Sequence, residues 1–187
     1  MPTHASERSI RAHRIELAVH TKARSDIRMD CVIHYGNQPT VGSESQQLLL
    51  EHHIAVCSPK LLLDRDAMRA SCLLHVFDDR QRFPLWEDWL AIEANHPDFP
   101  INASMEFASL ELAIQAAKNS VGIAVVDRAI IEYELSAGSL LPISAATVVG
   151  PRGYWLEISS EHQSKGRSVE LFRWLRSVRD TNTETFE

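Results

Sequence analysis

The sequence contains no hydrophobic run long enough to cross a membrane, which takes about eighteen consecutive apolar residues. Its first residues, MPTHASERSIRAHR, also lack the apolar core of a secretory signal. The three cysteines, Cys31, Cys57 and Cys72, show no CxxC spacing. An odd number of cysteines without metal-ligand spacing is typical of free thiols in a reducing compartment. These absences predict a cytoplasmic protein with no membrane partner.

An excess of positive charge is also missing. The formal net charge is -6 at pH 7 and the pI is about 5.8, whereas binding to phosphates needs a clustered excess of Lys and Arg. The nearest basic cluster, Lys22, Arg24 and Arg28, is interleaved with Asp26 and Asp30 and is interpreted as solvated surface. By itself, therefore, the chain is not expected to bind nucleic acid.

Catalytic and cofactor-binding motifs are absent as well. The sequence has no GxSxG, P-loop, GxGxxG, HExxH or HxH pattern, and its seven glycines leave little room for a phosphate cradle. His52 and His53 are adjacent, so on a strand they would point to opposite faces and could not chelate one ion. Asp78 and Asp79 are more consistent with a solvated turn than with an acid–base pair. The sequence therefore predicts no enzyme, no metal site and no cofactor.

What remains is the composition of an ordinary globular protein. The 187 residues are 44% hydrophobic and 24% charged, enough for one compact domain or two small interlocked ones. Apolar periodicity predicts strands that alternate with helices, and hence an α/β fold with mostly parallel sheets. Strands are expected at 13–20, 29–36, 52–59, 73–76, 101–107, 122–126 and 154–159, and helices or turns at 61–70, 84–94, from 110, 128–135 and 169–178. Residues 181–187 are expected to be a disordered tail.

The segment 107–127, FASLELAIQAAKNSVGIAVVD, gives the sharpest local prediction. Ser109 is a good N-cap, and apolar residues follow at i, i+3, i+4 and i+7, as in an amphipathic helix. Gly122 then opens a β-branched run that is typical of a strand buried on both faces. Trp86 and Trp89 share a helix face, for which core packing is the default and the lining of a cleft by Trp86 a weaker alternative. For His75, an ordinary hydrogen bond at a strand end is favoured over metal ligation.

The order of several motifs resembles a known family. The segments, in sequence order, are MDCVIHYGN, HIAVCSPKLL, LLH, WEDWL, FASLELAIQAAKNSVGIAVV, ELSAGSLLPI, YWL and FRWLRS. They are similar to the effector-binding domain of LysR-type transcriptional regulators, in the branch of the glycine-cleavage and β-lactamase activators. There the matching segments are roughly DLAIRYG, PVCSP, WxxWL, GVAL and DLAAGRL. The likeness covers about residues 8 to 178.

This resemblance implies two Rossmann-like subdomains, as in type 2 periplasmic binding proteins, with a small molecule bound between them. Subdomain I would comprise 8–55 plus 150–180, and subdomain II 56–149. The function implied is the small-molecule-sensing regulatory domain of a transcriptional regulator. The alternative is a cytoplasmic binding protein or dimerisation module of the same fold, without a transcriptional role of its own.

The resemblance also implies candidate effector-binding residues. The junction before the helix that starts at 110 would face the ligand with a hydroxyl and free N–H groups, which favour an anion; the structural alternative is that Ser109 only caps its helix. The implied effector is therefore a small molecule that is anionic or amino-acid-like. The candidates are Phe107, Ser109, Leu110, Tyr35, Gly36, Asn37 and Tyr154, with His75 and Trp86 as weaker ones.

The chain departs from the family pattern in two places. Ser120 stands where the family often has glycine, so Asn119 is expected to take the left-handed cap conformation instead. The chain also starts late relative to the family. The winged helix-turn-helix, the linker helix, the first strand and most of the first helix would be absent, so that subdomain I is incomplete. DNA binding would then belong to a missing domain. The neighbouring strands are expected to close up, or a homodimer or higher oligomer to fill the gap.

Overall fold

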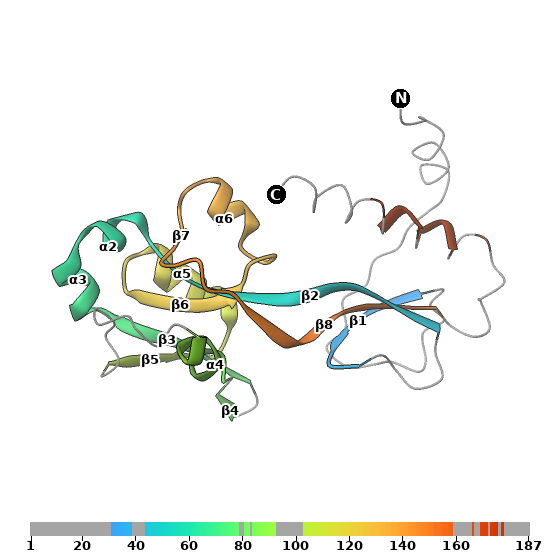
Figure 1. The fold of residues 1–187 in the computed structure, drawn as a ribbon, viewed down its shortest axis with the longest axis horizontal. Helices are drawn as coiled ribbons and strands as arrows, with labels where there is room; N and C mark the ends of the chain where they lie inside the picture. Colours follow the sequence, from blue (N-terminus) through green and yellow to red (C-terminus); the bar gives the residue numbers. More distant parts are fainter. Residues whose placement is uncertain are drawn as a thin grey trace. The chain divides into compact units, whose positions relative to one another are not determined.

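The computed structural model describes residues 31–38, 44–78, 81–82, 84–92, 103–158, 166, 169–171, 173–175 and 177. The chain divides into two compact units, one made of residues 1–50 and 152–187 and the other of residues 51–151. Two long strands, β2 (Glu44–Cys57) and β8 (Val148–Ile158), each pass from one unit into the other (Figure 1). The domain boundaries predicted from the sequence, at 55/56 and 149/150, fall inside these two strands.

The first unit is built on strand β1 (Cys31–Gly36), which pairs antiparallel with β8. In that register Tyr35 lies opposite Tyr154, and Gly36 lies opposite Gly153. β8 is also a neighbour of β2, and a Cβ at Gly153 would come within 2.5 Å of the carbonyl oxygen of Leu49. Only glycine allows so close an approach of the two backbones. The described residues between 169 and 177 are helical, as predicted. The predicted strand 13–20 and tail 181–187 lie outside the described residues.

The second unit contains a sheet in the order β2–β6–β3–β4, with β5 on β3 and β7 on β2. Its remaining strands are β3 (Cys72–Asp78), β4 (Gln81–Arg82), β5 (Ser104–Phe107), β6 (Gly122–Asp127) and β7 (Leu141–Pro142). The prediction of mostly parallel sheets is wrong. Among the strand pairs whose register the structure describes, only β3–β5 and β3–β6 are parallel, whereas β1–β8, β2–β6, β2–β7 and β3–β4 are antiparallel.

The error has a physical cause. β3, β5 and β6 follow one another through helical crossovers, which parallel pairing requires. β2 instead enters from the other unit and runs against β6. The apolar run in β6 correctly indicated a strand that is buried throughout. Burial on both faces, however, produces such a run whichever way the neighbouring strand points.

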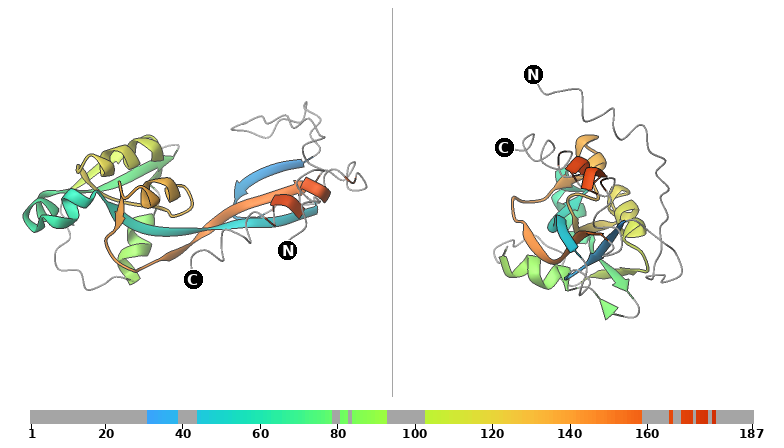
Figure 2. Two further views of the ribbon diagram at one scale, coloured as in Figure 1. Left: turned by 90° about the horizontal axis from the view of Figure 1, so that it is seen from above. Right: turned by 90° about the vertical axis from the view of Figure 1, so that its right-hand side faces the viewer.

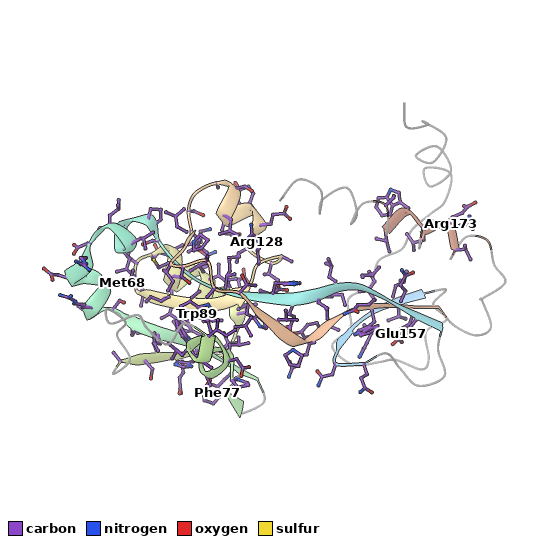
Figure 3. The ribbon with its side chains drawn as sticks, in the orientation of Figure 1. Met68, Phe77, Trp89, Arg128, Glu157 and Arg173 are labelled. Atoms are coloured by element: carbon purple, nitrogen blue, oxygen red, sulfur yellow. The ribbon has the colours of Figure 1, made fainter. Side chains whose placement is uncertain are left out.

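The core of this unit lies on both faces of the sheet, because successive strand residues point to opposite sides. One face packs against α5 (Leu110–Lys118), with Ile114 and Ala117 in its cluster. The other packs against α2 (Pro59–Leu63) and α4 (Leu85–Ile92), with Leu61 and both tryptophans of α4 in its cluster. Figure 2 gives further views of these helices and the sheet. Trp89 is fully buried among these side chains (Figure 3).

The described part of this unit also contains the helices α3 (Arg65–Ala70) and α6 (Glu132–Ser136). The predicted helix 61–70 is therefore two short helices, divided at Asp64, which caps the second one by accepting hydrogen bonds from Asp66 N and Ala67 N. Within the described parts of the chain, no helix is long and apolar enough to cross a membrane.

Helix α5 ends in a turn that corrects a second prediction. The N–H of Val121 donates to Ala116 O at 3.0 Å and that of Ser120 donates to Ala117 O at 3.1 Å, which is the hydrogen-bond pattern of a Schellman cap. Ser120 adopts the left-handed conformation, with φ of 64°, whereas Asn119 has φ of -88°. The assignment of this conformation to Asn119 was wrong.

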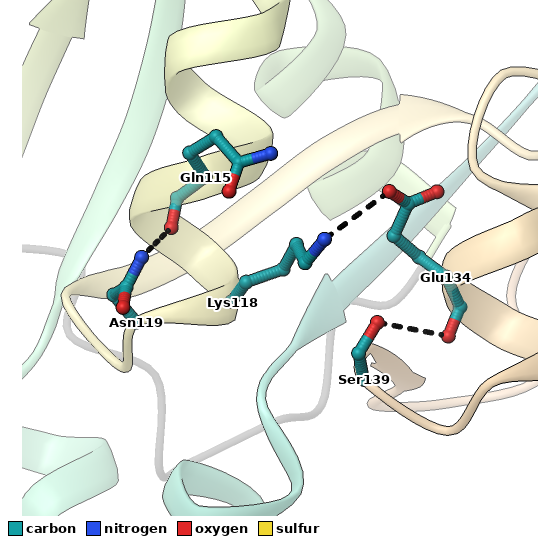
Figure 4. A network of polar contacts seen from close by, with 5 residues as sticks. All are labelled: Gln115, Lys118, Asn119, Glu134 and Ser139. Carbon is teal, nitrogen blue, oxygen red and sulfur yellow. Dashed lines mark hydrogen bonds and ion pairs between the residues drawn. The ribbon is translucent and has the colours of Figure 1, made fainter.

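The side chains of both residues explain the outcome. Asn119 Nδ2 donates a hydrogen bond of 2.7 Å to the carbonyl oxygen of Gln115 (Figure 4). Asn119 is therefore the C-cap residue, one position before the left-handed Ser120. The hydroxyl groups of Ser120 and Ser58 share a hydrogen bond of 2.7 Å. A net gain of about 1 kcal/mol from such a bond is similar in size to the cost of left-handed backbone in a residue with a Cβ.

Candidate functional site

Three of the residues predicted to bind a ligand lie where β5 ends and α5 begins. Ser109 has extended backbone, and its hydroxyl accepts a hydrogen bond of 3.3 Å from Leu112 N, so the predicted N-cap is confirmed. Phe107 and Leu110 are partly buried against the core cluster on the α5 face of the sheet. The positive end of the helix dipole lies at this point, and an anion is favoured there.

His75 and Trp86 lie on the other side of the same sheet. Their rings are 6.2 Å apart, and only 6% and 2% of the two residues is exposed. Trp86 Nε1 donates to Leu74 O at 3.0 Å, and its ring packs edge-on against Trp89. Trp86 is therefore placed as a core residue with its one polar atom hydrogen-bonded. The sheet separates this pair from Phe107, so the structure does not bring these predicted residues together.

Tyr35, Gly36 and Tyr154 do lie together, in the unit made of residues 1–50 and 152–187. The rings of Tyr35 and Tyr154 are 5.1 Å apart and tilted by 43°. The carbonyl oxygen of Gly36 accepts a hydrogen bond of 3.0 Å from Trp155 Nε1. Asn37 follows as an exposed bend after the strand.

A residue absent from the sequence prediction joins this group. The guanidinium carbon of Arg152 lies 5.8 Å from the centre of the Tyr35 ring, a distance typical of a cation–π contact. From the sequence, the strand was expected to begin only at Tyr154, two residues after Arg152. In the structure β8 begins at Val148 and includes Arg152. Alternation along that strand would have placed Arg152 on the same face as Tyr154.

A polar pair is buried where the second unit begins. Glu51 Oε1 and His53 Nε2 are 3.7 Å apart, and only 6% and 5% of these residues is exposed. They share a face of β2 because they are two residues apart. A Cβ at Gly150 on the neighbouring strand would come within 2.4 Å of the Glu51 carboxylate. Asp127, also buried, accepts hydrogen bonds from His52 N and Ala129 N at the end of β6. The bond from His52 N joins the middle of β2 to the end of β6.

The far end of α5 is tied to α6 by charge. Lys118 Nζ and Glu134 Oε1 are 3.3 Å apart, and the carbonyl oxygen of Glu134 accepts a hydrogen bond of 3.3 Å from Ser139 Oγ (Figure 4). Both charged side chains are only partly exposed, so the pair is screened less than a fully solvated one. This network links the C-terminal end of α5 to α6, and Ser109 lies at the N-terminal end of the same helix.

The described residues do not contain a group of three or more His, Cys, Asp or Glu side chains that could hold a metal ion. Burial raises the pKa of the Cys57 thiol to about 11, and it also raises the pKa of Cys72. Both thiols are therefore protonated near neutral pH, whereas a nucleophilic cysteine needs a lowered pKa.

Comparisons with known proteins give one consistent result. The profile of the LysR substrate binding domain matches residues 7–180. The HTH-type transcriptional activator AmpR of Enterobacter cloacae is 25% identical over 155 residues, which are 79% of this chain and 50% of the activator. The chain thus spans about half the length of this curated relative.

Solved structures with a similar fold include two effector domains of AmpR. The domain from Pseudomonas aeruginosa has a TM-score of 0.62 at 20% identity, covering 84% of this chain and 75% of that one. The domain from Citrobacter freundii has a TM-score of 0.63 at 21% identity, covering 82% and 76%. Full-length LysG from Corynebacterium glutamicum, solved with the bound effector Arg, has a TM-score of 0.53 at 17% identity, covering 79% and 50%. Domains of this kind have the fold of type 2 periplasmic binding proteins, as predicted.

Proposed function

The chain belongs to the LysR substrate binding domain family, and on that premise we propose that it is the small-molecule-sensing part of a transcriptional regulator. The observation that carries the proposal is the family match, which extends over residues 7–180 and so includes both units. The fold likeness to the AmpR effector domains supports it.

The proposal assigns the chain a regulatory rather than a catalytic role. Its relatives are transcriptional regulators. Among the described residues, the pKa of Cys57 is raised by burial, and no group of three or more possible metal ligands is found. Binding of an effector would stabilise the conformation that binds it best, and that shift in population is the signal. DNA would be bound by another part of the regulator, and the chain would act in the cytoplasm as a homodimer or higher oligomer.

Ser109 is the residue in the second unit that we assign to the effector. Its hydroxyl already accepts the N–H of Leu112, and a hydroxyl can in addition donate its own proton. The helix dipole of α5 favours a negative group at the same place. The proposal therefore expects an anionic or amino-acid-like effector, with capping and ligand contact performed by one side chain.

A thermal-shift screen tests the proposed function. The panel contains amino acids, small carboxylates, small amines, neutral sugars and cell-wall fragments, each added to the purified chain. A ligand present at 100 times its Kd stabilises the folded state by about 2.7 kcal/mol. For a chain of this size, that corresponds to a rise in Tm of roughly 5–10 °C.

Two tryptophan variants provide the matched comparison. Ser109→Trp places a large side chain at the proposed contact, whereas Leu112→Trp adds the same side chain on the outer face of α5, where Leu112 is 56% exposed. The response to the ligand should disappear in the first variant and persist in the second. If the folded parent chain responds to no compound of any class, the sensing function is wrong. If both variants respond as the parent does, Ser109 is not a contact.

A further inference from the structure

We draw no further inference here: the strongest candidate, the buried side-chain cluster of Glu51 and His53 on β2, carries nothing, because the two residues already pair with each other and the described residues do not add a third metal ligand to them.

Discussion

Gly122 is predicted to be the least replaceable residue of the second unit. It opens β6, the buried strand that pairs with both β2 and β3, and it lies directly opposite Cys72 in the parallel register with β3. A Cβ at this position would lie 2.1 Å from the Cys72 carbonyl oxygen and 2.9 Å from Leu74 Cδ2. Ordinary contacts begin at about 3.5 Å, so the backbone of one strand would have to move by more than an ångström.

The expected loss in the free energy of unfolding depends on which atom the added Cβ would clash with. A flexible side-chain end could turn away, but the carbonyl of Cys72 belongs to the sheet backbone. Overpacking in a well-packed core costs about 1–3 kcal/mol even where side chains can adjust. For Gly122→Ala we therefore expect a loss of at least about 3 kcal/mol in the free energy of unfolding.

Gly138→Ala is the matched control. Gly138 has φ of 65° and no atom within 4 Å of an added Cβ, so the substitution costs only the left-handed conformation, about 1–2 kcal/mol. Urea unfolding monitored through the fluorescence of the buried tryptophans of α4 measures both variants. Equal losses for the two substitutions would show that the close approach of β6 to β3 is wrong.

Three other substitutions or treatments give separable results. Ser109→Ala should lower stability by about 1 kcal/mol through loss of the N-cap, and Ser109→Asp should restore it; equal stability of all three chains in urea would exclude the cap. Trp89→Ala should cost about 3–5 kcal/mol, because the side chain is fully buried; a loss below about 1 kcal/mol would contradict that burial. Iodoacetamide at pH 8.5 should label Cys57, with its pKa of about 11, more slowly than half-buried Cys72, as peptide mass spectrometry can show. Because the pKa of Cys57 is raised on folding, its contribution to stability is present below pH 9 and is lost as the pH rises towards 11.

Local sequence patterns predicted the second unit well. Ser109 caps α5, and Gly122 opens a strand whose residues are all buried. Both features are decided within a few residues by capping chemistry and by apolar periodicity. The order of the strands in the sheet could not be predicted from local patterns, because it depends on which segment enters from the other unit.

The errors occurred where distant segments meet. β2 begins at Glu44 and β8 at Val148, several residues before the predicted starts, because their first parts are polar or contain Pro and Gly, which favour turns in local propensity. Arg152 was missed because it lies in the part of β8 before the predicted start of that strand. Ser120 rather than Asn119 is left-handed, and its hydroxyl shares a hydrogen bond with that of Ser58, which is far away in sequence. No window around Ser120 contains that information.

The central claim is that this chain senses a small molecule, and isothermal titration of the purified chain with the best compound of the thermal-shift screen tests it most directly. We predict saturable binding with one ligand per chain, which is lost in Ser109→Trp and kept in Leu112→Trp. Saturable binding that is identical in both variants would show that the ligand does not bind at the N-terminus of α5. Absence of heat and of saturation for a well-folded chain would contradict the sensing function itself.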